Sequence, residues 1–153
     1  MRRSRYWFAP TLAALVAATA AIAQIRDISE DDMRRERRVA LVIGNGAYAD
    51  SPLKNPVNDS REMTQALRNL GFDVIERNNA DQKTMRRAII EFGDRLRSHG
   101  GVGLFYFSGH GMQVAGRNYL IPVGAEIKAE SEVEVESVDA AAVLARMERP
   151  AAA

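Results

Sequence analysis

The stretch FYFSGHGM, residues 105–112, places His110 between two glycines directly after an apolar run. Glycine on both sides lets the backbone adopt conformations that are closed to other residues, and it leaves the imidazole and the neighbouring N–H groups uncovered. An uncovered imidazole can accept or donate a proton near neutral pH. His110 is therefore the first candidate for a catalytic side chain. The alternative is a structural histidine that closes a strand end through a hydrogen bond to the backbone.

The chain offers His110 few partners for covalent chemistry. Its 153 residues include no cysteine and two histidines, so it holds no disulfide, no thiolate nucleophile and no thiolate metal site. No spacing typical of a metal site occurs, and we expect neither a metal nor another cofactor. Ser108 is a poor nucleophile for His110, because it lies close by on the same strand and no third group that would orient the ring is visible.

A second loop with unusual residues, GNGAYAD, begins at Gly44 directly after another apolar run. Gly44, Gly46 and Ala49 match the G-x-G-x-x-A pattern of dinucleotide-binding folds. In those folds the glycines open the following helix, whose N-terminus meets the pyrophosphate. Here Pro52 and Pro56 separate the glycines from the first helical residue. Nucleotide binding by a Rossmann-like domain is therefore kept only as an outside alternative.

The elements that carry both loops follow from the apolar periodicity. The pattern predicts, in chain order, a buried strand over 39–43, a helix over 59–69 capped by Asn58 and ended by Gly71, a strand over 72–77, a helix over 81–98, a strand over 102–107, a hairpin over 112–123 that turns at Gly116, and a helix over 137–148. Strands that alternate with helices indicate right-handed crossovers and a parallel three-layer sheet. Ligands of such sheets bind beyond the carboxyl ends of the strands, where both loops lie.

Composition and charge restrict the class of protein. Apolar residues make up 46% of the chain, which is enough for one domain with a core. The 21 basic and 20 acidic residues leave a net charge of +1, and no dense basic face indicates nucleic acid. We therefore expect a single domain that does not bind nucleic acid.

The N-terminus resembles a secretory signal peptide. Three arginines precede a short alanine-rich stretch, and small residues lie three and one positions before a cut after Ala23. We expect cleavage there, a secreted or periplasmic protein, and no stable membrane insertion afterwards. The alternative is an uncleaved membrane anchor over 6–23. The expected order is a signal peptide over 1–23, a charged linker over 24–38, a folded domain over 39–149 and a tail over 150–153.

Three motifs, in order, resemble one protein family. They are ALVIGNGAY, then L-x-N-P-x-N-D through the following helix to LGFDV, and then FYFSGHGMQVAGRNYLIPV. Over residues 38–147 they resemble the caspase-like cysteine peptidases, and specifically the bacterial metacaspase branch. The resemblance implies a caspase-hemoglobinase fold, which is a three-layer α/β sandwich with a mainly parallel sheet. It also implies proteolysis of a peptide or protein substrate after basic residues.

The same resemblance implies roles for four residues. His110 matches the histidine of the Cys-His dyad, which assists attack by the thiol and protonates the leaving amine. The backbone N–H of Gly111 would bind the oxyanion. Asp59 and Ser108 would help to line the pocket for a basic side chain before the cut bond. The structural alternatives are a charge stabilised by the helix dipole for Asp59, and a strand-end hydroxyl bonded to backbone for Ser108.

The chain departs from the family at the nucleophile. In caspase signatures the cysteine lies about 50 residues after the histidine, which from His110 places it beyond Ala153. One hypothesis is a truncated, inactive N-terminal part of a secreted cysteine endopeptidase. The other is a pseudoenzyme that binds a peptide or protein through the strand edge beside His110. Under both hypotheses the sheet is incomplete, and we expect edge-strand association.

Overall fold

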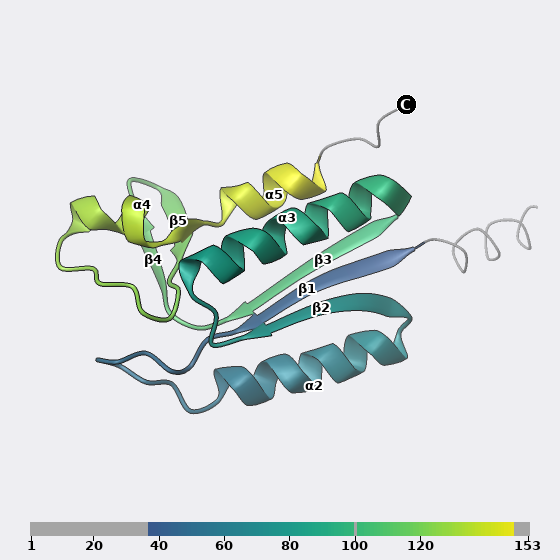
Figure 1. The fold of residues 1–153 in the computed structure, drawn as a ribbon, viewed down its shortest axis with the longest axis horizontal. Coiled ribbons are helices and arrows are strands. Elements are labelled where there is room, and N and C mark those ends of the chain that lie inside the picture. The colour runs from purple at the N-terminus through teal and green to yellow at the C-terminus, as the bar shows by residue number, and fades with distance from the viewer. Residues whose placement is uncertain (1–36, 100, 149–153) are drawn as a thin grey trace, which may run out of the picture. The chain divides into compact units, whose positions relative to one another are not determined.

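Three parallel strands form the central sheet. The computed structural model describes residues 37–99 and 101–148. Its first three strands are β1 (Arg38–Gly44), β2 (Phe72–Asn78) and β3 (Val102–Ser108). They lie in the order β2-β1-β3 (Figure 1), and their registers bring Gly44, Asn78 and Ser108 side by side at the carboxyl edge. The predicted parallel sheet is confirmed, and both loops singled out in the sequence leave this edge.

The central position of β1 follows from its side chains. Residues 39–43 are all apolar and none is more than 3% exposed. A strand that is apolar on both faces is stable only when both faces are covered. In β1 the two faces contribute to separate cores, with Val39, Leu41 and Ile43 on one side and Ala40 and Val42 on the other.

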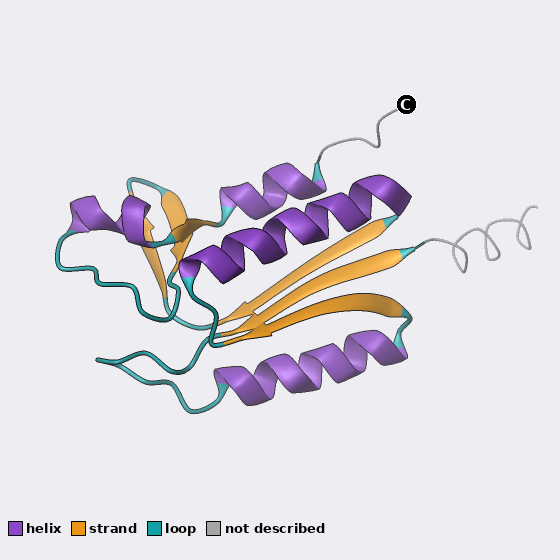
Figure 2. Ribbon diagram, in the orientation of Figure 1, coloured by secondary structure: helices purple, strands orange, loops and turns teal. Residues whose placement is uncertain are grey.

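Helices cover both faces of this sheet. The helix α2 (Pro56–Asn69) packs on one face, and α3 (Gln82–His99) with α5 (Ala141–Met147) packs on the other (Figures 1 and 2). The larger core lies on the α3 side, where Met85 and Phe92 are fully buried. This arrangement confirms the predicted three-layer α/β architecture.

The helix α2 begins earlier than predicted. The predicted cap, Asn58, is wrong, because Asn55 occupies the cap position and Pro56 is the first helical residue. Proline suits this position, since its fixed φ is already helical and the N–H that it lacks has no helical partner in the first turn. Asp59 therefore lies within the first turn. Gly71 ends the helix as predicted, in the left-handed region with φ of 81°.

A second, antiparallel sheet follows the central one in the chain. It consists of β4 (Gly111–Val114), β5 (Arg117–Leu120) and β6 (Val138–Asp139), in the order β4-β5-β6. Between β4 and β5, Ala115 and Gly116 have positive φ of 49° and 78°. Two consecutive residues with positive φ form the tight turn that matches the twist of a hairpin. The predicted hairpin with its turn at Gly116 is confirmed.

The last predicted helix, over 137–148, is wrong in its first half. This segment instead contains β6 followed by α5. It is preceded by a 3₁₀ turn, η1 (Glu130–Glu132), and the short helix α4 (Val133–Glu136). Val138 pairs with Leu120 and is 3% exposed, because burial of a β-branched side chain in a sheet outweighs the helix preference of the alanines around it. Asp139 then accepts a hydrogen bond from the N–H of Ala141 (2.9 Å), where α5 begins.

Several predictions fall on other parts of the chain. The predicted signal peptide, nearly all of the charged linker and the tail lie outside the described residues. The strand β1 begins at Arg38, one residue before the predicted start of the domain. Among the described helices, none combines the length and the hydropathy that a membrane crossing requires.

Candidate active site

His110 lies in the short segment between β3 and β4, at the carboxyl edge of the central sheet. Its Nε2 is 2.7 Å from the carbonyl oxygen of Ser51, in the loop between β1 and α2. A carbonyl oxygen only accepts hydrogen bonds, so this contact places the proton of the neutral ring on Nε2 and leaves Nδ1 as an acceptor. No described residue hydrogen-bonds Nδ1. His110 therefore has one nitrogen held by the protein and one available for chemistry.

The carbonyl of Ser51 is the orienting group that the sequence did not show. The expectation that no third group orients the ring is corrected, because the group is a backbone carbonyl rather than a side chain. Every residue carries a carbonyl, so no residue type or spacing marks the one that matters. The structural alternative for His110 holds only in part: the ring does bond to backbone, but through one nitrogen.

The N–H of Gly111 faces the outer edge of the second sheet. The N–H of Ile121 donates to the carbonyl of His110 (3.0 Å), so these two residues occupy a hydrogen-bonded position of the ladder. Gly111 and Leu120 form the next pair, and the N–H of Gly111 therefore points away from β5. Because β4 is an edge strand among the described residues, this N–H can donate to a bound carbonyl or oxyanion.

A pocket of about 710 Å³ opens beside His110. His110, Gly111 and Met112 line it together with the loop residues 48–51 and 124–128. Its volume lies within the range of about 300–1,000 Å³ that is common for ligand sites. Apolar side chains, two carboxylates and one ammonium group contribute to the lining. His110, Gly111 and Ser51, whose carbonyl holds the imidazole, thus line a single space.

Asp59 and Ser108 form a separate pair at the same edge. Ser108 ends β3 and its Oγ donates to Oδ2 of Asp59 (3.1 Å), in the first turn of α2. Neither residue lines the pocket beside His110. The bond directs the proton of Ser108 to a carboxylate rather than to His110, which disfavours a Ser-His nucleophile. The position of Asp59 also suits the helix dipole, so both interpretations of its charge remain.

Tyr48 contacts His110 through both its ring and its hydroxyl, and the sequence did not single it out. The two ring centroids lie 4.4 Å apart at an interplanar angle of 51°. The N–H of His110 donates to Oη of Tyr48 (3.0 Å), and this hydroxyl donates to the carbonyl of Ile121 (2.9 Å). Burial raises the pKa of Tyr48 despite the hydrogen bonds to His110 and Asn45, which lower it. The hydroxyl therefore stays protonated and keeps its role as a donor.

Asn45 and Tyr48 both donate to the carbonyl of Ile121. Asn45 is fully buried at the end of β1, and its Oδ1 accepts a hydrogen bond from the N–H of Ala80 (2.8 Å). Its Nδ2 donates to the carbonyls of Ala80 (3.2 Å) and Ile121 (3.3 Å). One amide side chain thus joins the ends of β1, β2 and β5, and a buried amide with its bonds satisfied fixes the geometry of these segments.

The GNGAYAD loop does not present its donors to a ligand. The N–H groups of Gly46 and Ala47 donate to Oδ1 of Asn79 (2.9 and 3.0 Å). A nucleotide phosphate would need such N–H groups at the start of a helix, whereas α2 begins only at Pro56. These contacts count against the Rossmann-like alternative.

The candidate site contains an imidazole, an outward-facing backbone N–H and a pocket, but no thiol. The sequence contains no cysteine. Within residues 37–99 and 101–148, no three or more His, Cys, Asp or Glu side chains are grouped so that they could hold a metal ion.

Comparison with known proteins identifies the family. A family model described as "Caspase domain" matches residues 37–146. The human (Homo sapiens) mucosa-associated lymphoid tissue lymphoma translocation protein 1 is 36% identical over 108 residues, which are 70% of this chain and 13% of that protein. Its mouse (Mus musculus) homolog is 38% identical over 96 residues, which are 62% of this chain and 11% of that protein. The chain thus spans only a small part of each curated relative that it matches.

The matched region contains every described strand and helix, except for the last residue of α5. The predicted bacterial metacaspase branch stays a prediction, because these two relatives are human and mouse proteins. The parallel sheet with helices on both faces is the architecture that the resemblance implied. The chain belongs to the caspase-domain family of cysteine peptidases.

Proposed function

We propose that this domain binds a peptide at a basic residue and holds it against the histidine half of a caspase-type peptidase site. One observation carries the proposal: His110 and Gly111 line the same pocket, while the carbonyl of Ser51 holds Nε2 of the ring and leaves Nδ1 without a partner among the described residues. A base and an oxyanion donor at one space are the two groups that acyl transfer needs besides a nucleophile.

Binding without cleavage is the expected behaviour of these 153 residues alone. In cysteine peptidases a thiolate attacks the scissile carbonyl, and the histidine then protonates the leaving amine. The sequence contains no cysteine, and the proton of Ser108 is directed to Asp59. A bound peptide would meet the base and the oxyanion donor but no activated nucleophile.

We expect the peptide to run between two pairs of site residues, His110 with Gly111 and Asp59 with Ser108. A carbonyl bonded to the N–H of Gly111 would leave the following residues in the pocket that Gly111 lines. The preceding side chain would then lie toward Asp59, whose carboxylate attracts a guanidinium or ammonium group. The hydroxyl of Ser108 holds that carboxylate at the edge of the sheet.

Calorimetric titration tests the proposal with an acetylated, amidated peptide that contains one internal arginine. We expect affinity to fall about tenfold in Asp59→Asn, as for the loss of one charge-assisted hydrogen bond. Asp94→Asn is the matched control, because Asp94 pairs with Arg97 on α3. Mass spectrometry of the same samples should find the peptide intact. Unchanged affinity in Asp59→Asn would remove Asp59 from the site, and cleavage that depends on His110 would require a nucleophile in this chain.

A second candidate function, a module that binds partners by strand addition, rests on the edge of β3. The N–H of Val102 donates to Arg37 and the carbonyl of Ser108 accepts from Asn45, so even-numbered residues of β3 bond toward β1. The backbone groups of Phe105 and Phe107 therefore face outward, without a partner strand among the described residues. A partner strand would protect these amides from hydrogen exchange, whereas a peptide at His110 would not.

Export is a further part of the proposal. Its support is the pattern of arginines, apolar residues and small residues before Ala23. N-terminal sequencing of the protein from the periplasmic or culture fraction of an expressing bacterium should begin at Gln24. A chain that starts at Met1 and remains with the membranes would instead support the uncleaved anchor.

A further inference from the structure

The hydroxyl of Tyr48 takes the place of one hydrogen bond in the ladder between β4 and β5, at the position of His110. In a regular antiparallel pair, His110 and Ile121 would exchange two direct N–H···O bonds. Only one is direct, from the N–H of Ile121 to the carbonyl of His110 (3.0 Å). The other runs through Tyr48, which accepts from the N–H of His110 (3.0 Å) and donates to the carbonyl of Ile121 (2.9 Å).

This insertion holds the backbone of His110 away from β5. In a direct bond, the nitrogen of His110 and the carbonyl oxygen of Ile121 would lie about 3 Å apart. With the hydroxyl oxygen of Tyr48 between them, they lie 3.0 and 2.9 Å from that oxygen instead. The hydroxyl therefore keeps the ladder open at the residue that precedes Gly111. Because Gly111 follows directly, the opening also helps to set where its N–H points.

Gly109 shows how closely Tyr48 approaches this segment. A Cβ at position 109 would lie 2.7 Å from Oη of Tyr48, which is closer than carbon and oxygen can pack. The ring of Phe107 lies almost as close (2.8 Å), so Tyr48 and Phe107 together restrict the space at the first glycine of SGHG. The ring of Tyr48, which is 9% exposed, also lies against the imidazole. The tyrosine therefore constrains His110 through its backbone and through its ring.

We infer that Tyr48 is a positioning residue, which keeps His110 on the carbonyl of Ser51 and the N–H of Gly111 directed at the peptide. The inference rests on the proposed function for its link to the peptide, but the geometry of His110 can be tested in the free protein. Without the hydroxyl, the two groups that it bridges would close on each other or remain unpaired. The first change moves the backbone of His110 relative to Ser51, and the second removes a restraint on its position.

The test is ¹⁵N NMR of the His110 ring in wild type, Tyr48→Phe and Tyr106→Phe, at about pH 8, where an ordinary imidazole is neutral. Tyr48→Phe keeps the ring contact and removes only the hydroxyl. Tyr106, in β3, packs against the α2-side core and provides the matched control. In wild type and in the control we expect the Nε2–H form to dominate. In Tyr48→Phe we expect a mixture of both tautomers and about tenfold faster exchange of the His110 amide, because one hydrogen bond is lost.

The outcomes separate this inference from the proposed function. If the Arg peptide fails to bind wild type, the proposed function fails, yet a changed tautomer in Tyr48→Phe still supports the positioning role. If the peptide binds and Tyr48→Phe leaves both the tautomer and the amide exchange unchanged, the positioning role is wrong. Should Tyr48→Phe not fold, the wild-type spectrum decides: a slowly exchanging hydroxyl proton with a cross-peak to the His110 amide is expected, and its absence contradicts the inference.

Discussion

The two edge strands of the central sheet, β2 and β3, both pair with β1 but carry different side chains. The strand β2 has the sequence FDVIERN, with three charged residues, whereas β3 has the sequence VGLFYFS, with none. Charged side chains on an edge strand discourage pairing with further strands. The comparison indicates that the β2 edge is suited to remain free and the β3 edge is suited to be covered.

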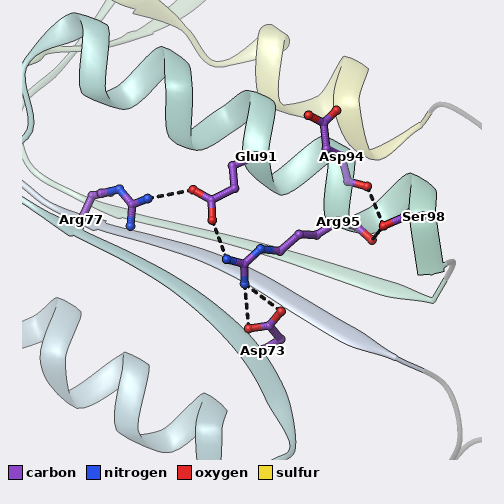
Figure 3. A network of polar contacts seen from close by, with 6 residues as sticks. All are labelled: Asp73, Arg77, Glu91, Asp94, Arg95 and Ser98. Atoms are coloured by element: carbon purple, nitrogen blue, oxygen red, sulfur yellow. Dashed lines mark hydrogen bonds and ion pairs between the residues drawn. The ribbon is translucent and has the colours of Figure 1, made fainter.

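An ion-pair network reinforces the β2 side (Figure 3). Arg95 of α3 bonds to Asp73 of β2 (2.7 Å) and to Glu91 (2.5 Å), and Glu91 also pairs with Arg77 of β2 (2.8 Å). Burial lowers the pKa of Arg95, but the bonds to both carboxylates outweigh it and raise the pKa. Each arginine and Glu91 is about one-third exposed, so the network adds little stability. Its position on β2 instead matches the role of charges that protect an edge.

The β3 side is held by apolar contacts instead. Phe105 and Phe107 pack against the α3-side core, and Leu104 and Tyr106 against the α2-side core, yet each of the four remains half-buried. The strand that bears the candidate active site at its end thus has four large side chains that are incompletely covered.

The largest expected effect is the loss of an aromatic ring on the β3 side. Phe107→Ala should lower the free energy of unfolding by about 2 kcal/mol, near half the loss for a fully buried phenylalanine. Phe72→Ala on β2 is the matched control, and its loss should be smaller because the α2-side core holds fewer buried residues. Urea denaturation measures both values. An equal or larger loss for Phe72→Ala would show that the β3 side does not contribute more to stability than the β2 side.

Hydrogen exchange at two protein concentrations tests whether the β3 edge associates and the β2 edge does not. The amides of Phe105 and Phe107 face outward on β3, and those of Val74 and Glu76 face outward on β2, since Asn79 bonds toward β1. Edge association through the uncharged strand should slow exchange at Phe105 and Phe107 about tenfold at high concentration, as for the gain of one hydrogen bond. The amides of β2 should not respond. Concentration-dependent protection on β2 alone would reverse the assignment of the two edges.

The ion pairs on the β2 side should make a smaller contribution to the unfolding free energy, and salt should remove it. Glu91→Gln breaks both of its ion pairs and should cost less than about 1 kcal/mol of unfolding free energy, because the pairs are partly exposed. The cost should vanish in about 1 M salt, where screening is strong. Glu62→Gln, at an exposed position on α2, serves as the control. A loss that persists at high salt would mean that Glu91 contributes mainly by packing.

Acid should affect the start of α3 and leave the β3 strand unchanged. The N–H of Thr84 donates to Asp81 (2.7 Å), and the hydrogen bonds with Thr84 hold the pKa of Asp81 below its ordinary value of 3.8. A lowered pKa in the folded state means that the stabilisation is present above the ordinary pKa and is lost as the pH falls through the lowered one. After correction for intrinsic rates, protection of the Thr84 amide should therefore decline in strong acid. Asp81→Asn should remove this pH dependence, and its persistence there would assign the effect to another carboxylate.

The central strands and the candidate histidine could be predicted because their signals are local. The continuous apolar run of β1 and the glycines around His110 need no distant residue to be recognised. The hairpin was predictable for the same reason, since the turn chemistry lies in Gly116 itself.

The groups that orient the histidine could not be predicted because they act across the fold. Ser51 contributes a carbonyl that any residue type would supply, and Tyr48 lies 62 positions from His110. The prediction of the last helix failed for a related reason. Val138 pairs with Leu120 in the second sheet, which outweighs the helix preference of the alanines near it. The prediction of a cap at Asn58 failed because the helix already begins at Pro56.

We expect His110 and Gly111 to face one bound peptide that stays intact. This can be tested by NMR titration of the ¹⁵N-labelled protein with the Arg peptide, followed by mass spectrometry of the peptide. We predict that the largest shifts occur at the Gly111 amide and the His110 ring, and that the peptide keeps its full mass. Saturable binding that leaves Gly111 and His110 unshifted, or cleavage of the peptide by this cysteine-free chain, would contradict the account.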